Sequence, residues 1–466
     1  MALTTLHRTL FRKRVSRIAL CASLVTGLAG TSTVAAELST PDLPNLDEAR
    51  ATLAGAVQYL DQTQQKVSAP DGEDFFSGEW PSYMMTTKNI RFVGRSHHGG
   101  YDSNNFTVSS IHNILAPIHQ RQPWLTQIPA MLDLSMERIL SYRTGDSFNF
   151  WPLLPPKTYS TNIRGFEKIR RPNHFVINHP TLEAGCNVPN DADDTAVSFT
   201  AMRNYNEVRP EKSVEVPKDI GSIFAPWRDD NRVIPHFYNF LTGVTRTGAF
   251  MTWLWPERAL NPITYWPSKR RLYIPYGFND VDCVVNANVL NALARYSELD
   301  TPGVEQACEF VNWAFESGHQ NTCGVYYPSP YNPHYVVAKA YHAGATCLKP
   351  ALDRAVSEIL EKQQADGSWA SHIEGDAVHT GLYALNTLLY AGDTQSRGTG
   401  PAIDAGIRSA LQSRQVRENG TVAWEPGVFF SGGTFARYWI FWRSEPYTTA
   451  LGAEALSLYL KQREAN

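Results

Sequence analysis

The chain has 466 residues, of which 42 are Lys or Arg and 45 are Asp or Glu, so its formal net charge is −3. A protein whose main partner is nucleic acid needs a basic face for the phosphates, and this charge balance argues against such a partner. After the N-terminal region no apolar segment is long enough to cross a bilayer, so we expect no transmembrane span in the mature chain.

Residues 1–36 have the three parts of a secretory signal peptide. Five basic residues come first, an apolar run from Ile18 to Leu28 follows, and small residues end at Ala36. This pattern predicts export to the periplasm or secretion, with an uncleaved anchor as the alternative. Loss of the five basic residues shifts the formal charge from −3 to −8. We expect the mature chain, residues 37–466, to form a single domain.

The mature chain keeps an odd number of cysteines, which leaves at least one thiol outside any intramolecular disulfide. They are Cys186, Cys283, Cys308, Cys323 and Cys347. An oxidising compartment allows disulfides to form. The pairing cannot be deduced from sequence. Cys308 with Cys323 is one candidate pair, which would join a helix to the turn after it.

A turn with a glycine and an aromatic residue recurs along the chain, each time after a candidate helix. Clear copies lie at 78–80, 324–326, 366–369 and 420–424, and looser copies lie at 148–151 and 248–253. The stretch 351–364 is an example of the preceding helix, because Leu352, Ala355 and Ile359 recur there at helical spacing. A unit that repeats along the whole chain predicts a repeat architecture.

Six other segments align without gaps, and each places a polar cluster before an apolar helix. Their first residues are Asp102, Asp191, Asp280, Asn332, Asp376 and Glu445. Short polar residues suit helix N-caps, where they accept free backbone N–H groups. Pro333 and Pro446 stand in the first helical position that proline favours. The helices that follow are apolar on nearly all sides, which predicts that they are buried.

We therefore expect an all-α fold, an (α/α)6 toroid in which six inner helices are ringed by six outer helices. The N-termini of the inner helices would emerge at the same end, so the six polar clusters would converge on one mouth. Long insertions in the early repeats, at 152–190, 206–234 and 256–278, are expected to form walls and lids around this mouth.

Two motifs resemble those of class II terpene cyclases such as squalene-hopene cyclase. Residues 191–196 match the D-x-D-D-T-A acid motif, and residues 363–369 match the Q-x-x-D-G-S-W end of their repeat. Residues 376–380 resemble the D-x-x-H-T metal segment of protein prenyltransferase β subunits, whose D-x-C segment aligns with 280–282. The resemblance places the chain in the terpenoid cyclase and prenyltransferase toroid superfamily.

The resemblance implies that Asp193 protonates an alkene, with Asp191 and Asp194 as hydrogen-bonding and charge partners. The three carboxylates also predict acid chemistry on their own terms. Crowding and burial raise the pKa of at least one such group, which then holds a proton near neutral pH. The alternative is that these residues only cap the helix, and that reading is strongest for Asp191.

Polar and aromatic residues of the six segments and their neighbours are candidates for substrate binding. They are Asp102, Asn104, Asn105, Tyr335, Trp442, Glu445 and Tyr447. Aromatic rings at a mouth can stabilise a carbocation, stack a sugar or pack a core.

Asp280, Asp282 and His379 form a second candidate group. Carboxylate and imidazole together suit a divalent metal such as zinc. A histidine buried in the core is the alternative for His379. No other cofactor is indicated.

Three functions remain open on sequence alone. The first is acid-initiated cyclisation or isomerisation of an isoprenoid with Asp193 as proton donor. The second is cleavage of a polysaccharide, as a hydrolase or a lyase, by carboxylates at the mouth. The third is a ligand- or protein-binding toroid without catalysis. The expected partner is a small-molecule or oligomeric substrate in the toroid mouth. A deep aromatic pocket would favour the first, an open polar groove the second and a filled centre the third.

Overall fold

The computed structural model describes residues 43–86, 100–157, 167–174, 183, 185–230, 239, 242–255, 279–392, 397–432 and 440–464. The predicted signal peptide at 1–36 lies outside the described residues, as do the insertion at 256–278 and parts of the other two. Within the described chain, no helix is both long and apolar enough to cross a membrane.

Six helices pack side by side in a closed ring. They are α2 (Asn105–Arg121), α5 (Ala192–Val208), α8 (Cys283–Arg295), α10 (Asn332–His342), α12 (Ala377–Ala391) and α14 (Glu445–Glu464). Each packs against the next in chain order, and α14 closes the ring against α2. Every residue of α14 from Pro446 to Leu460 is buried, as expected for a helix with neighbours on all sides.

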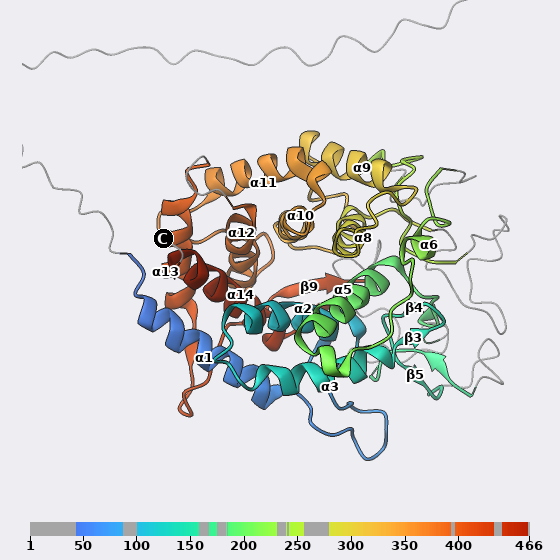
Figure 1. Cartoon of the computed structure of the whole chain (residues 1–466), viewed down its shortest axis with the longest axis horizontal. Helices are drawn as coiled ribbons and strands as arrows, with labels where there is room; N and C mark the ends of the chain where they lie inside the picture. The colour runs from blue at the N-terminus through green and yellow to red at the C-terminus, as the bar shows by residue number, and fades with distance from the viewer. Residues whose placement is uncertain are drawn as a thin grey trace, which may run out of the picture. The chain divides into compact units, whose positions relative to one another are not determined.

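Further helices lie outside this ring. They are α1 (Leu46–Thr63), α3 (Ile128–Leu140), α9 (Val304–Glu316), α11 (Lys349–Lys362) and α13 (Gly400–Ser413), with the short η1 (Pro210–Lys212) and η4 (Thr346–Leu348). In the described part of the third hairpin, the outer helix is only α6 (Gly221–Phe224). Figure 1 shows α9 and α11 outside α8, α10 and α12. The predicted (α/α)6 toroid is confirmed.

The first turns of the inner helices lie at the same end of the ring. The rings of Phe106 in α2 and Tyr447 in α14 meet at 6.4 Å. The His379 Nδ1 in α12 lies 2.8 Å from the Thr448 Oγ1 in α14. The Asn105 side chain at the start of α2 donates across to α5 at 2.8 Å. The predicted convergence of these helix starts is thus present.

The expectation of an all-α fold missed several short strands. A four-stranded antiparallel sheet has the order β2 (Gly100–Tyr101), β1 (Tyr83–Thr86), β10 (Ile440–Arg443) and β9 (Val428–Ser431). Three two-stranded sheets pair β3 (Arg143–Thr144) with β4 (Ser147–Phe148), β5 (Leu153–Leu154) with β6 (Ile169–Arg170), and β7 (Gln415–Val416) with β8 (Val422–Ala423). The large sheet joins segments far apart in the chain, and such non-local pairing leaves no pattern in either segment alone.

Three of the predicted turns hold their tryptophan in the same way. The Trp369 Nε1 donates to the carbonyl of Ile359 near the end of α11 at 2.9 Å. Trp80 and Trp424 donate equivalently to α1 and α13, at 2.7 and 2.8 Å. In these three turns the tryptophan therefore donates to a carbonyl of the outer helix that precedes it, which gives the repeated motif a structural reason.

A glutamine before two of these turns ties consecutive outer helices together. The Gln363 Nε2 donates to the carbonyl of Ala402 in α13 at 2.9 Å. The Gln64 Nε2 donates to the carbonyl of Met131 in α3 at the same distance. Both amides are directed at backbone groups of the next helix, so this part of the motif is structural.

The two disulfides are Cys283–Cys323 and Cys308–Cys347, and Cys186 is free and half-buried. The suggested pairing of Cys308 with Cys323 is wrong, because Cys323 lies against the start of α8 while Cys308 in α9 meets the segment before α11. We expect thiol titration of the denatured, unreduced mature chain to find one free thiol. A count of three or five would contradict this pairing.

Candidate active site

The acid motif begins α5, and Asp191 is its N-cap. The Asp191 Oδ1 accepts the backbone N–H of Asp194 at 2.7 Å, as the position of Asp191 in the sequence predicts. Its Oδ2 has no hydrogen-bond partner among the described residues. Burial raises the pKa of Asp191 well above its usual range, and the negative charge of Asp193 adds to this effect.

Asp193 is the member of the motif that meets side chains from other elements. Its Oδ1 accepts the Nδ2–H of Asn288 in α8 at 2.7 Å, and its Oδ2 accepts the Tyr327 hydroxyl. The side chain is buried. Burial raises the pKa of Asp193 to about 6, although the hydrogen bonds from Tyr327 and Asn288 lower it. A carboxyl group with this pKa is poised to donate a proton in mildly acidic solution.

Asp194 has a buried side chain whose Oδ1 lacks a partner among the described residues. Burial raises the pKa of Asp194 well above its usual range, and the charges of Asp191 and Asp193 raise it further. Because neighbouring carboxylates oppose each other's ionisation, the motif retains protons near neutral pH. Asn105 donates to Ser198 at 2.8 Å and to the backbone carbonyl of Asp194 at 3.5 Å, so it links α2 to α5.

Both side-chain partners of Asp193 are absent from the predicted site. Asn288 is one of three asparagines, with Asn286 and Asn291, in the otherwise largely apolar helix α8. A polar side chain in a buried helix needs a partner, so its position was a usable signal. Tyr327 directly follows the turn at 324–326, and nothing in the sequence distinguishes it from the neighbouring tyrosine.

A cavity of about 380 Å³ extends along the inside of the ring, and all six inner helices contribute to its wall. Along α10 it reaches from Asn332 in the first turn to His342 at the end. Aromatic and amide side chains line it, with cations towards the C-terminal ends of the helices. The residues that matter below are Phe106, Asn113, Val197, Asn204, Asn288, Asn291, Arg295, Tyr335, Lys339, His342, Tyr390 and Tyr447.

Asp193 adjoins the N-terminal end of this axial cavity. Its partner Asn288 lines the cavity, as does Val197, which lies one helical turn after Asp193 on α5. Tyr335 and Tyr447, two of the predicted substrate-binding residues, also line it. The structure thus brings these predicted residues to one space within the ring.

The N-terminal end of the ring is covered by aromatic side chains centred on Phe430 of β9. The Phe430 ring lies 5.0 Å from Phe150, 5.7 Å from Tyr326 and 5.1 Å from Trp442 of β10, measured between ring centroids. Phe106 of α2 meets the same ring at 6.3 Å. The end of the ring at which the mouth was predicted is therefore closed by packed rings, which bury one another's apolar surface.

We call this aromatic layer over the N-terminal end of the ring the roof. Three predicted substrate-binding residues, Trp442, Asp102 and Asn104, lie in the roof and not in the cavity wall. The Trp442 Nε1 donates to the Asp102 Oδ2 at 2.6 Å, and the Trp151 Nε1 does so at 3.4 Å. Asn104 caps α2 by accepting the backbone N–H of Thr107 at 2.8 Å. The N-cap of α2 is thus two residues later than the sequence alignment implies, and Asp102 is left to bind indoles.

Glu445, also predicted to bind substrate, lies at the first residue of α14 and is directed outward. It accepts the Tyr59 hydroxyl of α1 at 2.5 Å and the Arg417 guanidinium at 2.8 Å. These contacts tie α14 to α1, and both carboxylate oxygens of Glu445 accept hydrogen bonds in them.

The candidate metal ligands are each engaged with protein groups. Both oxygens of Asp282, the N-cap of α8, accept backbone N–H groups. Asp280 accepts the Tyr326 hydroxyl at 2.9 Å. His379 contacts Thr448, and its Nε2 has no partner among the described residues. In the described chain no three His, Cys, Asp or Glu side chains are grouped as metal ligands. Zinc at this site stays a prediction.

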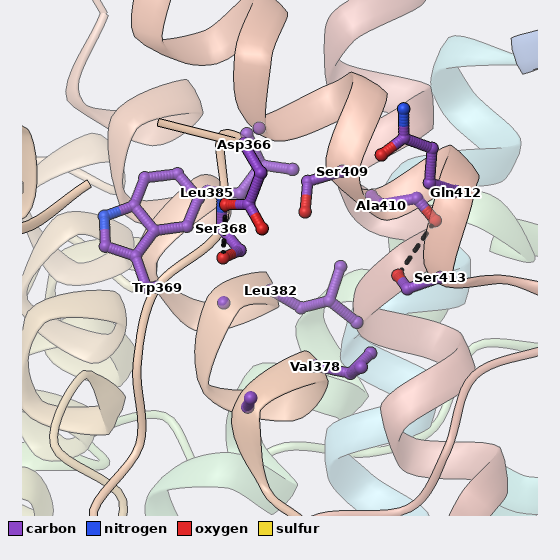
Figure 2. Close-up of a pocket in the computed structure, with 13 residues that line it drawn as sticks. Asp366, Ser368, Trp369, Val378, Leu382, Leu385, Ser409, Ala410, Gln412 and Ser413 are labelled. Carbon is purple, nitrogen blue, oxygen red and sulfur yellow. Dashed lines mark hydrogen bonds between the residues drawn. The ribbon is translucent and has the colours of Figure 1, made fainter. Parts of the chain in front are cut away.

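A second pocket, of about 320 Å³, opens between α12 and α13. Figure 2 shows Trp369, Leu382 and Leu385 around it, with the Ser368 hydroxyl donating to Asp366 at 2.7 Å. Asp366 is exposed and its hydrogen bonds with Ser368 lower its pKa, so it carries no proton near neutral pH. We assign no chemistry to this pocket.

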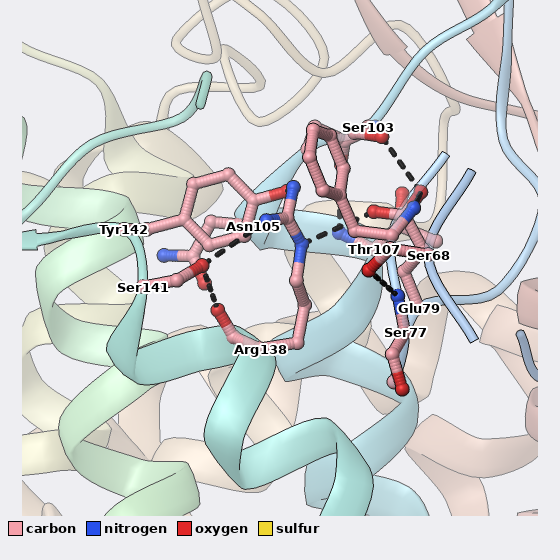
Figure 3. Close-up of polar contacts among 12 residues, drawn as sticks. Ser68, Ser77, Glu79, Ser103, Asn105, Thr107, Arg138, Ser141 and Tyr142 are labelled. Carbon is pink, nitrogen blue, oxygen red and sulfur yellow. Dashed lines mark hydrogen bonds and ion pairs between the residues drawn. The ribbon is translucent and has the colours of Figure 1, made fainter. Parts of the chain in front are cut away.

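A buried ion pair lies between α3 and the turn at 78–80. The Arg138 Nε donates to the Glu79 Oε2 at 3.2 Å, and its Nη2 donates to the Tyr142 hydroxyl at 2.6 Å. The Ser103 hydroxyl donates to Glu79 at 2.7 Å (Figure 3). Because the charges are paired and hydrogen-bonded within the cluster, it is a structural contact between the first two hairpins.

The buried carboxyls make stability depend on pH. Burial raises the pKa of Asp102 and of Asp282 from 3.8 to about 7. Because the folded state binds these protons more tightly than the unfolded state, the protonated carboxyls contribute fully to stability below pH 3.8. This contribution is lost as the pH rises from 3.8 through 7. We expect the melting temperature of wild type relative to Asp102→Asn to fall between pH 4 and pH 7. A difference that stays constant over this range would contradict the raised pKa.

No protein-family model matches the sequence, and no curated protein matches it. Solved structures do share the fold. A variant of the type II terpene cyclase MstE from Scytonema, with its substrate geranylgeranyl dihydroxybenzoate, matches with a TM-score of 0.51 and 14% identity over 89% of this chain and 98% of that one. Substrate-free MstE gives the same TM-score and identity over 90% and 99%.

Another MstE variant, with its product merosterolic acid A, also gives a TM-score of 0.51 and 14% identity, over 89% and 98% of the two chains. Identity this low shows the fold alone. The chain therefore has the helical toroid fold of a type II terpene cyclase, and the whole of that fold is represented in it.

Proposed function

We propose that the protein is an exported enzyme of the terpenoid cyclase superfamily that protonates an isoprenoid and so starts its cyclisation or isomerisation. The observation that carries the proposal is the position of Asp193, a buried acid with a pKa raised to about 6, in contact with Asn288, which lines an axial cavity. MstE, which shares the fold, has a geranylgeranyl compound as substrate, and this adds support.

In the proposed reaction the carboxyl of Asp193 transfers its proton to one carbon of an alkene. The π electron pair forms the new C–H bond and leaves a carbocation on the other carbon. In cyclisation a second alkene of the same chain supplies the electron pair that closes the ring. Loss of a proton from a neighbouring carbon to water then restores an alkene, so charge and atoms balance.

The cavity offers groups suited to these steps. The rings of Phe106, Tyr335 and Tyr447 line it, and their faces can stabilise positive charge on carbon. Tyr327 and Asn288 hold the carboxyl of Asp193 in place before the proton transfer and stabilise the carboxylate after it.

Export is supported by two features. Residues 1–36 have the signal-peptide pattern. The mature chain forms two disulfides, which are rare in proteins that stay in the reducing cytosol.

The proposal is tested by incubating the mature protein with geranylgeranyl compounds and detecting products by mass spectrometry. Because the donor must be protonated, we expect kcat/KM to be highest below pH 6 and to fall about tenfold per pH unit well above it. A rate that is flat or rises between pH 5 and pH 8 would remove Asp193 as the acid.

A second candidate function, cleavage of a glycan by hydrolysis or by lyase-type elimination, has one observation in its favour. The amides of Asn113, Asn204 and Asn291 line the cavity and suit sugar hydroxyls. Release of shorter or unsaturated oligosaccharides in the same mass-spectrometric assay, without isoprenoid conversion, would favour it.

A further inference from the structure

The end of the axial cavity opposite Asp193 is basic. Arg295, Lys339 and His342 line it, and they lie in the last turns of α8 and α10. These side chains are partly accessible, so they stand where the cavity meets solvent. The two ends of the cavity therefore differ in chemistry, with an acid at one and cations at the other.

Two further cations surround this end. Burial lowers the pKa of His342, and the charges of Arg121, Arg295, Lys461 and Lys339 lower it further. Arg121 and Lys461 belong to the last turns of α2 and α14. Cations stabilise the C-terminus of a helix through its dipole, which accounts for one cation on each helix. It does not account for several cations facing the same cavity and repelling one another.

Carboxylates near this end neutralise only part of the charge. Glu454 of α14 is fully buried and accepts hydroxyl groups from Tyr335 and Tyr390 at 2.6 Å each, and Lys339 lies 3.5 Å from it. Arg295 pairs with no carboxylate in the described part of the chain. The charge of Glu207 acts on Arg295 and raises its pKa, but this carboxylate already pairs with Arg203 at 2.8 Å. A guanidinium that burial has partly stripped of water, with no carboxylate of the described chain in direct contact, has unused capacity for an anion.

We propose that the C-terminal end of the axial cavity binds the anionic head group of the substrate, so that its apolar chain extends along the cavity towards Asp193. Arg295 is the principal contact, because its planar guanidinium matches a phosphate or carboxylate in a bidentate manner. Lys339 adds a point charge beside it. This inference rests on the proposed function only for the direction of the chain, and binding of the anion stands independently.

The spacing of the two ends fits a prenyl chain. Asn288, which contacts Asp193, and Arg295 are both on α8 and are seven residues apart, or about 10 Å along the helix axis at about 1.5 Å per residue. A substrate held by its head at Arg295 thus presents an alkene several carbons away to the acid. Binding at the head sets which alkene is protonated.

The test measures binding by calorimetry to the whole mature protein. The probes are inorganic pyrophosphate, geranylgeranyl diphosphate, geranylgeranyl dihydroxybenzoate and, as a ligand without charge, geranylgeraniol. We expect wild type to bind the anionic probes in a salt-dependent manner. Arg295→Gln should weaken the affinity for the anionic probes at least about tenfold, since hydrogen bonds to charged groups are among the stronger ones. The affinity for geranylgeraniol should stay unchanged. Comparison of the diphosphate and benzoate arms identifies the class of anion.

Arg354→Gln, on the exposed face of α11, is the matched control and should bind like wild type. Lys339→Gln provides a second variant if Arg295→Gln fails to fold, as judged by circular dichroism. Equal affinity for the alcohol and the diphosphate, or no effect of either substitution on the anions, would overturn the inference. Asp193→Asn should retain anion binding, so loss of catalysis and loss of the head-group site are distinguished.

Discussion

Replacement of Gly78 by alanine is expected to destabilise the toroid by about 3 kcal/mol or more, the range of severe steric substitutions. Gly78 has a φ of +88°, and an added Cβ would lie 2.1 Å from the backbone carbonyl oxygen of Leu134 in α3. Neither backbone can yield easily, because Gln64 also ties this turn to α3. The substitution therefore forces the first two outer helices apart.

Gly72→Ala is the matched control for Gly78→Ala. Gly72 also has a positive φ, +66°, but nothing lies within 4 Å of the added Cβ. It should cost only the left-handed backbone strain, about 1–2 kcal/mol. Urea unfolding of both variants measures the difference. Equal losses of stability would show that the close approach of the turn to α3 is not present in solution.

Asp193→Asn is expected to reduce kcat by at least about a hundredfold, the lower end of the contribution of a positioned acid. The amide keeps the size of the carboxyl group and one acceptor for Tyr327 or Asn288, so the fold should persist, but it has no acidic proton to give. Product formation from geranylgeranyl compounds at pH 5.5 is the measurement.

The control for this substitution is Asp300→Asn, an exposed acid just after α8 with no part in the proposed site. It should keep the activity of wild type. If Asp193→Asn retains more than about half of that activity while Asp300→Asn does too, proton transfer comes from another group.

The toroid could be predicted from sequence because its signals are local. Six helices that are apolar on nearly all sides, each preceded by a polar cluster, must all be surrounded by other elements. A closed inner ring buries all six. The roof could not be predicted, because Tyr83 pairs with Arg443 and neither segment shows the pairing alone. The cap positions were only partly right, because Asp191 caps α5 while Asn104 and Asp282, two positions later in the alignment, cap α2 and α8.

The candidate site was predicted at its acid and missed at its far end. Asp193 lies in a recognisable motif, whereas Lys339 and Arg295 look in sequence like ordinary cations of a helix C-terminus. Their shared cavity depends on how the helices close into a ring, which single-helix patterns do not encode. The predicted substrate-binding residues Asp102 and Trp442 are brought together, but in the roof, the aromatic layer over the N-terminal end of the ring, because indole donors satisfy the buried carboxyl there.

Proton transfer from solvent-exchanged Asp193 to carbon is the step on which the proposed function depends. Conversion of a geranylgeranyl substrate by wild type in deuterium oxide at acidic pH measures it directly. We predict a product that carries one deuterium on the carbon that was protonated, and no such product from Asp193→Asn. A product without carbon-bound deuterium, or identical labelled product from the variant, would contradict acid-initiated chemistry at this residue.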